Sequence, residues 1–278
     1  MSIAMIEDLV SVLLPVHRNN PYLEEALQSL INQDYPNIEI LFLDNSKDGL
    51  SPEMWNKSNK IRHIKVPGEY GLSETLNIGI RESAGVFIVR MDYDDVSLPS
   101  RVREQVKFMQ ANEQIGISGT FAQVIGKGID LNVKPGEIIH RPTNPNALME
   151  YLLYKNPIIH PTVIMRKSLL SKYDLRYNKK FDSAEDLDFW ARAVRFFPIG
   201  NLAIPLLKYR IHESQYSRLD GINSRLQSAI IRSRHATWVL LTNKDLKTQA
   251  AKALVKNLLV VIKLRTSKLI SRSFTKFE

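Results

Sequence analysis

The chain has 278 residues, of which 44% are hydrophobic, so it is long enough for one large α/β domain, alone or with an appendage. It contains no cysteine, which excludes a disulfide framework, thiolate metal ligands and a cysteine nucleophile. The net charge of +9 is uneven: residues 222–278 hold twelve basic and two acidic residues, a net of +10, and residues 1–221 are close to neutral. We therefore expect a domain over residues 1–221 and a basic extension over residues 222–278.

From the sequence we expect neither a targeting segment nor a membrane-spanning segment. Glu7 and Asp8 precede the first apolar run, and no basic region comes before it, so we expect no signal peptide. Lys256, Lys263 and Arg265 interrupt the most apolar stretch near the C-terminus, so we expect no membrane span. With the absence of cysteine, these features predict a cytoplasmic protein.

The first ninety residues alternate between apolar runs and helical periodicity. Strands are expected at residues 10–16, 38–43, 61–66 and 86–89, with helices over residues 21–31 and 73–82 between them. This alternation predicts a doubly wound, mainly parallel sheet with helices on both faces, whose ligands bind beyond the carboxyl ends of the strands. Asp44 and Asp92 would both lie at that edge.

Less regular elements follow Pro99. We expect a helix marked by Val102, Val106 and Met109, and then a strand over residues 115–120. Residues 126–146 are rich in Gly, Pro and Asn and predict a loop. The remaining expected elements are a helix over residues 145–155, a strand over 162–165, a helix opening at 183–186, a strand over 206–212 and two C-terminal helices.

Three carboxylates, Asp92, Asp94 and Asp95, follow directly on the run at residues 86–89. Carboxylates this close repel one another and shift towards their neutral forms unless a cation lies between them. Mg2+ and Mn2+ prefer oxygen ligands of this kind. The alternative is a solvated turn in which Asp95 or Ser97 caps the next helix, and the cluster alone does not decide between the two.

A series of segments in one order decides it. The segments are VSVLLPVHRN, SLINQDYPNIEI, LFLDNSKDG, GLSETLNIGI, VRMDYDDVSLPSRVREQV, NPIIHPTVIMR, AEDLDFWARA and YRIHESQYS. Over roughly residues 9–217 they resemble the nucleotide-diphospho-sugar glycosyltransferases of family 2, which have the GT-A fold. Two positions depart from the family pattern: Asn45 replaces its usual second acid, and Leu76 replaces an arginine that often contacts the nucleotide.

The resemblance implies roles for residues of the donor site. Pro15, Val16 and Asp44 resemble the nucleobase pocket, and Asp92 resembles the residue that contacts the ribose. Asp94 resembles the ligand of the Mn2+ or Mg2+ ion that neutralises the leaving diphosphate. His212, in the YRIH segment, resembles a histidine that approaches the metal in some relatives. A histidine at a strand end is as often only a hydrogen-bond partner, so both readings of His212 stay open.

The acceptor side is assigned in the same way. Asp186 resembles the general base of the inverting members, and Glu185 precedes it; the alternative is that both acids only favour the dipole of their helix. His160 is expected to line the acceptor side, or to hold a loop against the Asn156 turn. Trp190 lies four residues after Asp186 and could stack on a sugar, although tryptophan at such a position is more often in the core.

The implied activity is that of a metal-dependent, inverting hexosyltransferase. Its expected donor is a nucleoside-diphosphate sugar, of the UDP type, and its acceptor is a saccharide hydroxyl in cell-surface polysaccharide synthesis, such as O-antigen or capsule, carried on a polyprenyl diphosphate lipid. A noncatalytic sugar-nucleotide binder is the alternative. A nucleic-acid binder is disfavoured, because residues 1–221 are near neutral and the basic residues are not interleaved with aromatic ones. The oligomeric state is open.

The basic extension has its own periodicity. Apolar residues at positions 250, 251, 254, 255, 258, 259 and 262 form a stripe, and Lys252, Lys256 and Lys263 lie beside it. A basic amphipathic helix can lie in an anionic membrane interface. The extension is therefore expected either to bind the inner face of the cytoplasmic membrane peripherally or to pack on the domain as a solvated helix.

Overall fold

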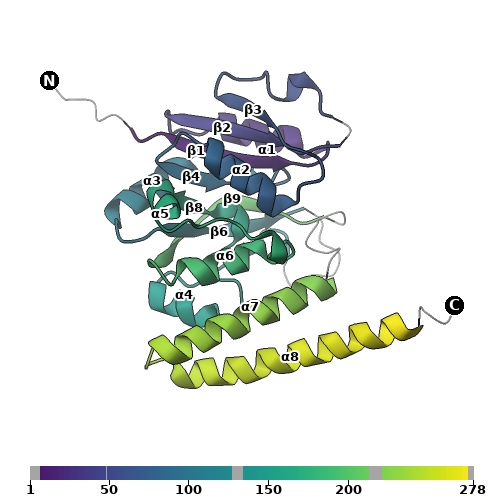
Figure 1. The fold of residues 1–278 in the computed structure, drawn as a ribbon. Coiled ribbons are helices and arrows are strands. Elements are labelled where there is room, and N and C mark those ends of the chain that lie inside the picture. The colour runs from purple at the N-terminus through teal and green to yellow at the C-terminus, as the bar shows by residue number, and fades with distance from the viewer. Residues whose placement is uncertain (1–6, 48, 127–133, 213–220, 275–278) are drawn as a thin grey trace.

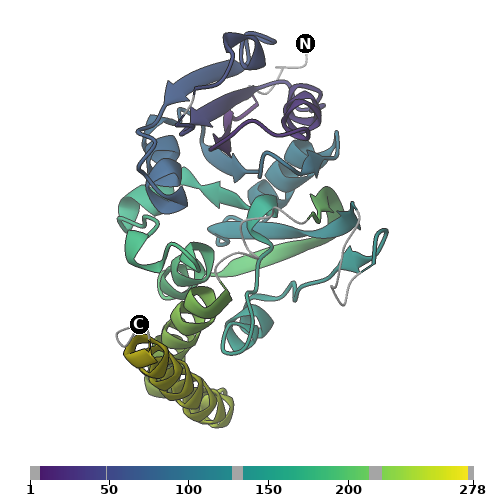
Figure 2. The ribbon, with the colours of Figure 1, turned by 90° about the vertical axis from the view of Figure 1, so that its right-hand side faces the viewer.

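A computed structural model describes residues 7–47, 49–126, 134–212 and 221–274, and side chains are described as far as residue 266. Several expectations fall outside these ranges: the absence of a signal peptide in its first six residues, residues 127–133 of the expected loop, residues 213–217 of the last family-like segment, and Lys276. The described elements form one mixed nine-stranded sheet with helices on both faces and a pair of long helices at one end (Figures 1 and 2).

The N-terminal half of the sheet is parallel, as the alternation predicts. Its strands are ordered β3-β2-β1-β4, and Val16 pairs with Asp44 while Leu13 pairs with Arg90. The carboxyl ends of β1, β2 and β4 therefore meet at one edge. The elements of this half are β1 (Val10–Val16), α1 (Leu23–Ile31), β2 (Ile38–Asp44), a 3-10 turn (Pro52–Met54), β3 (Ile61–Lys65), α2 (Leu72–Glu82) and β4 (Phe87–Arg90).

The second half of the sheet is mixed. Strand β8 pairs antiparallel with β4 and β6, β9 runs parallel to β6, and β5 and β7 add short antiparallel edges. Its elements are β5 (Val96–Ser97), α3 (Arg101–Ala111), β6 (Ile117–Ile125), β7 (Ile138–Ile139), α4 (Pro145–Tyr151), β8 (Ile164–Arg166), α5 (Lys167–Lys172), α6 (Glu185–Ala193) and β9 (Ile199–Arg210), with 3-10 turns at His160–Thr162 and Lys179–Phe181.

Alternate residues of β1 serve two separate core layers, because neighbouring strand side chains point to opposite faces. Val12 belongs to the layer that includes Leu27 of α1 and Val106 of α3. Leu13 belongs to the layer that includes Leu76 of α2 and Leu187 of α6. Strand β1 is buried along its whole length, and this explains its continuous apolar sequence.

The basic extension forms two helices, α7 (Gly221–Thr242) and α8 (Lys247–Phe274), which run back along each other below the sheet (Figures 1 and 2). Helix α7 contacts α6, and a small cluster joins the pair to the domain. The buried members of that cluster are Leu153, Ala236, Val239, Ala250 and Ala253. Within the described residues, neither these helices nor the others combine the length and the apolarity that crossing a bilayer needs.

Some element boundaries differ from those expected. Helix α1 begins at Leu23, and Asn20 accepts a hydrogen bond from the backbone N–H of Tyr22 at 2.7 Å instead of opening the helix itself. Strand β9 begins at Ile199, seven residues earlier than expected, and it bends where its register with β6 shifts after Thr120. A bulged strand interrupts the period of two, and this conceals its first half in the sequence.

Gly85 provides a test of the close approach of β1 and β4. A Cβ atom there would lie 2.5 Å from the backbone nitrogen of Ser11 and 2.7 Å from the carbonyl oxygen of Leu9. Gly85→Ala therefore has to displace backbone, and we expect it to lower the free energy of unfolding by about 1–3 kcal/mol in urea titrations. In the matched variant Gly221→Ala, a Cβ meets no described atom within 4 Å, and we expect an unchanged midpoint. Equal midpoints for both variants would contradict this packing.

Candidate active site

A cleft of about 1080 Å3 opens at the carboxyl ends of β1, β2 and β4. One wall comes from the segments that follow β1 and β2, and another from the N-terminal ends of α2 and α6. The floor consists of the end of β4 and the two acids Asp92 and Asp94. Among the lining residues are 15–19, 45–47, 70–72, Arg90, Asp92, Tyr93, Asp94, Asn156, 158–161, Asp182, Ser183, Glu185, Asp186 and Ser224.

Arg90 lies buried in the floor of the cleft and makes a two-pronged ion pair with Asp92. Its Nη1 donates to Asp92 Oδ2 at 2.7 Å, and its Nη2 donates to Asp92 Oδ1. Burial alone would lower the pKa of Arg90, but the charge and hydrogen bonds of Asp92, with a further contribution from Glu185, raise it above its ordinary value. Arg90 therefore stays charged and fixes the carboxylate of Asp92 in the cleft.

Asp94 also faces the cleft, and the structure brings it to His212. The Nε2 atom of His212 lies 2.9 Å from Asp94 Oδ2. Ligand oxygens of Asp92, Asp94 and Asp95 all lie within 4.8 Å of one another. Carboxylate oxygens suit Mn2+ or Mg2+, so the carboxylates gathered here fit the expected cation.

Asp95 is turned away from the cleft, into the domain. It is 1% exposed, and its Oδ1 accepts a hydrogen bond from the backbone N–H of Arg210 at 2.8 Å. Burial, followed by the nearby charges of Asp92 and Asp94, raises the pKa of Asp95 well above its usual range. Asp95 thus ties the acidic loop to the end of β9 and leaves the cleft to the other two acids.

The predicted nucleobase pocket is present only in part. Pro15 and Val16 line the cleft, but Asp44 is buried behind Ser46, whose hydroxyl and backbone N–H both donate to Asp44 Oδ1. Asp44 Oδ2 lies 3.1 Å from Lys65 Nζ and 3.2 Å from His63 Nε2. Burial raises the pKa of Asp44, but these hydrogen bonds outweigh it and the pKa is lowered. Asp44 is thus not among the lining residues and supports Ser46, which is one of them; its contact with a base stays a prediction.

Glu185 and Asp186 open helix α6, and both line the cleft. Asp186 Oδ2 accepts a hydrogen bond from the Asn156 side-chain amide, and Oδ1 accepts one from the backbone N–H of Leu187 at 2.6 Å. Burial raises the pKa of Asp186, and burial raises the pKa of Glu185 to about 7. The two carboxyl groups are therefore held at one end of the cleft, where a proton can be accepted near neutral pH.

His160 and Trp190 lie together behind the acid pair. His160 Nε2 lies 3.0 Å from the Tyr177 hydroxyl and Nδ1 lies 3.5 Å from Glu185 Oε1. Burial lowers the pKa of His160 to about 3, so the imidazole is neutral and lies beside Glu185 without forming an ion pair. Trp190 is fully buried with its ring edge against His160 at 5.9 Å between centroids, so it has no face to offer a sugar. Of the two readings of Trp190, the structure thus agrees with a place in the core.

Asn156 and Asp182 are site residues that sequence reasoning did not select. Asn156 belongs to an Asn-Pro pair, which was interpreted as a turn. Asp182 precedes α6 as a capping residue would, but its Oδ1 accepts from the backbone N–H of Ser73 at 2.9 Å at the start of α2. A Cβ on Gly71 would lie 1.9 Å from Asp182 Oδ2, so glycine there makes room for the carboxylate. In the sequence, the glycine at position 71 was the one sign that another group approaches the start of α2 closely.

The two departures from the family pattern have structural roles. The Asn45 side-chain amide donates to the carbonyl oxygen of Tyr70 at 2.6 Å and to the Thr75 hydroxyl at 3.1 Å, which joins the end of β2 to α2. Leu76 is fully buried in the core layer between α2 and the sheet. Neither position therefore presents a charge to the cleft.

The sequence is similar to those of known glycosyltransferases. A glycosyltransferase of Haemophilus influenzae described as uncharacterized is 30% identical over 240 residues, which are 84% of this chain and 74% of that protein. The O-antigen biosynthesis glycosyltransferase WbnJ of Escherichia coli is 32% identical over 216 residues, 74% of this chain and 81% of that protein.

Two solved structures share the fold and confirm the expected GT-A architecture. Staphylococcus aureus TarS 1-349 in complex with UDP-GlcNAc has a TM-score of 0.64 at 19% identity and covers 91% of this chain and 81% of its own. The mannosyltransferase PcManGT from Pyrobaculum calidifontis, in complex with GDP-Man and Mn2+, has a TM-score of 0.64 at 15% identity over 97% of this chain and 76% of its own. A sequence model of glycosyl transferase family 2 matches residues 11–174, and the chain belongs to that family.

Proposed function

We propose that this family 2 glycosyltransferase inverts the anomeric centre of its donor and moves a hexose from a UDP-sugar to a hydroxyl of a saccharide acceptor. The observation that carries the proposal is the division of acids in one cleft. Asp92 and Asp94 lie on its floor beside His212, and Asp186 lies at the N-terminus of α6 on its wall. One group of acids serves the leaving diphosphate and the other serves the nucleophile.

The donor end of the cleft uses the residues that follow β1, β2 and β4. Pro15 and Val16 line the pocket for the nucleobase, and Asp92, held by Arg90, contacts the ribose. Asp94 and His212 would hold Mn2+ or Mg2+, which supplies Lewis-acid stabilisation of the departing diphosphate when bound. The complexes of TarS with UDP-GlcNAc and of PcManGT with GDP-Man and Mn2+ support a nucleotide-sugar donor and a divalent ion.

The acceptor end uses Asp186 as general base. Its carboxylate accepts the proton of the acceptor hydroxyl while that oxygen attacks the anomeric carbon from the side opposite the diphosphate. The Asn156 amide and the Leu187 N–H donate hydrogen bonds to this carboxylate, so it is already oriented before the acceptor binds. An α-linked donor then gives a β linkage, and Glu185 and His160 shape the acceptor side.

The acceptor is proposed to be a saccharide on a polyprenyl diphosphate at the inner face of the cytoplasmic membrane, in cell-surface polysaccharide synthesis. The similarity to the O-antigen biosynthesis enzyme WbnJ supports this class of product. In this proposal residues 1–221 are the catalytic domain and residues 222–278 are an accessory extension.

A screen of sugar nucleotides tests the activity. Thermal unfolding is measured with UDP-glucose, UDP-N-acetylglucosamine, UDP-galactose and GDP-mannose, each with Mn2+ or with a chelator. A ligand at a hundred times its dissociation constant raises the free energy of unfolding by about 2.7 kcal/mol. We expect a Mn2+-dependent shift with a UDP-sugar and then Mn2+-dependent hydrolysis of that donor. A shift without hydrolysis would assign a noncatalytic binder, and no shift with any of them would contradict the proposal.

Asp94 and Asp95 provide a matched test of the metal site. Asp94→Asn removes a charged ligand that faces the cleft, and we expect the affinity for Mn2+ in the presence of UDP to fall more than about tenfold in calorimetric titrations. Asp95→Asn keeps the acceptor for the Arg210 N–H and does not line the cleft, so Mn2+ affinity should fall less than in Asp94→Asn. Equal losses in the two variants would place Asp95 in the coordination shell.

Asp186→Asn tests the base. The amide keeps the size of the carboxylate but accepts no proton, so turnover should fall by about two to four orders of magnitude. Donor affinity, measured by the thermal shift with the sugar nucleotide and Mn2+, should not change, because Asp186 lies at the acceptor end. Turnover near the parent value would remove Asp186 from the base role.

The raised pKa of Glu185 predicts a pH dependence of stability. Between its ordinary pKa of 4.5 and the raised pKa of about 7, Glu185 keeps a proton in the folded protein that it releases in the unfolded chain. The contribution of Glu185 is therefore fully present below pH 4.5 and is lost as the pH rises to about 7. Over this range the unfolding free energy of the parent should fall by on the order of 3 kcal/mol relative to Glu185→Gln, in urea titrations with chelator. Parallel curves for the two proteins would contradict burial of this carboxyl.

A further inference from the structure

Helix α8 has an apolar face on the side that points away from the rest of the protein. Its inward face carries Ala250, Ala253 and Asn257, which are buried, and the Asn257 amide donates to the carbonyl oxygen of Leu153 at 3.3 Å. The opposite face carries apolar side chains with no cover in the described structure. We call this face the outer strip, and it consists of Ala251, Val255, Leu258, Leu259 and Ile262.

The outer strip is exposed to a degree that packing against α7 does not explain. Val255 is 60%, Leu259 is 61% and Ile262 is 60% exposed, and Leu258 is 45% exposed. Apolar side chains that gather on one face in this way mark an interaction surface, whereas single exposed ones do not. The spacing of four and seven residues places them along one side of the helix for about three turns.

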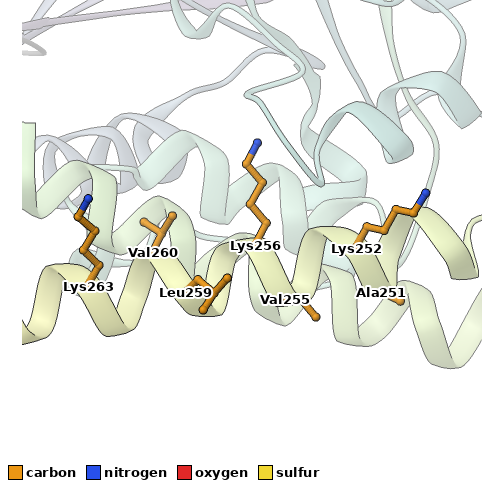
Figure 3. A pocket seen from close by; sticks show the side chains of 7 residues that line it. All are labelled: Ala251, Lys252, Val255, Lys256, Leu259, Val260 and Lys263. Carbon is orange, nitrogen blue, oxygen red and sulfur yellow. The ribbon is translucent and has the colours of Figure 1, made fainter.

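Lysines line one edge of this strip. Figure 3 shows Lys252, Lys256 and Lys263 extending to the same side of α8, while Val255 and Leu259 turn the other way. All three lysines are exposed and, with the apolar side chains beside them, they border a shallow groove. The sequence of α8, Lys247–Phe274, contains seven basic residues and no acidic residue.

We propose that the outer strip and its row of lysines form a docking surface for a bilayer that contains anionic phospholipid. Apolar side chains of the outer strip would enter the boundary between headgroups and acyl chains. The lysine ammonium groups at its edge would meet the lipid phosphates at the level of the headgroups. A second copy of the chain fits less well, because pairing two outer strips would bring lysine rows together with no carboxylate on either helix to neutralise them.

The position of α8 relates this surface to the cleft. Helix α8 runs back along α7, and the first turn of α7 reaches the cleft, where Ser224 is a lining residue (Figure 1). Gln227 of α7 accepts a hydrogen bond from the backbone N–H of Ser183 at 3.1 Å, directly before the acid pair of α6. A bilayer on α8 would therefore lie on the side of the protein where the acceptor enters; this step alone rests on the proposed lipid-linked acceptor.

Vesicle flotation with the full chain tests the docking surface. Vesicles of phosphatidylcholine alone are compared with vesicles that also contain phosphatidylglycerol, at low and at high salt. We expect binding only to the anionic vesicles and weaker binding at high salt, because salt screens the lysine charges. Equal binding to both kinds of vesicle, or binding to neither, would overturn the proposal.

Two sets of variants separate charge from apolar contact. The triple variant Lys252→Glu, Lys256→Glu and Lys263→Glu should bind anionic vesicles at least about a hundredfold more weakly, since each lysine near such a surface contributes about fivefold and each new carboxylate is repelled. The matched control carries Arg81→Glu, Lys107→Glu and Lys172→Glu, three exposed positions of the catalytic domain, and should bind as the parent does. Comparable losses in the two variants would assign binding to net charge and overturn the proposal.

The apolar set is Val255→Gln, Leu259→Gln and Ile262→Gln, which keeps the inward face of α8 and its helix propensity. It should lose vesicle binding by at least about tenfold, whereas Val86→Gln with Ile204→Gln, exposed positions elsewhere, should not. Thermal midpoints and Mn2+-dependent donor hydrolysis are measured in each protein, so a failed docking surface is distinguished from a failed activity. A parental dimer that the apolar set converts to a monomer, without vesicle binding, would assign the strip to a second copy instead.

Discussion

The buried guanidinium of Arg90 is the group on which the geometry of the cleft depends. An unpaired charge at this depth would cost several kcal/mol, so its partners must stay in place. Asp92 meets it with both oxygens, and Glu185 also acts on it electrostatically. The backbone carbonyl oxygen of Arg90 accepts a hydrogen bond from the side chain of the buried Arg101 at 2.8 Å. One cation therefore orients Asp92 after β4 and acts electrostatically on Glu185 at the start of α6.

The acids around this cation differ because their surroundings differ. Asp44 keeps a lowered pKa through its contacts with Ser46, His63 and Lys65, whereas burial raises the pKa values of Asp95 and Asp186. Acids in and beside one cleft thus have different surroundings: Asp44 supports Ser46, Asp95 holds the end of β9, and Asp186 lies in the first turn of α6. These differences follow from depth and hydrogen bonding, neither of which the spacing of the acids reveals.

The parallel half of the fold was predictable from sequence because β1 and β2 are long, uninterrupted apolar runs between helices of regular period. Strand β5, at two residues, and β8, at three, are too short to give a period, so the mixed half was not predictable. Asp92, Asp94 and Asp186 could be selected through the order of the segments around them. Trp190 could not be oriented, since its burial depends on His160 and Phe189, and Asn156 reads as a turn residue until its contact with Asp186 is known.

The extension shows how the width of an apolar arc decides what a helix can contact. Packing α8 against a single neighbour requires only a narrow row of residues, and Ala250, Ala253 and Asn257 provide it. The sequence, however, carries apolar residues around more than half of the helix, so the predicted stripe divides into an inward row and an outward one. Lysines stand at the boundary between them. A helix so divided can be held by the domain on one side and can meet a second apolar phase on the other, and both contacts can be made at once.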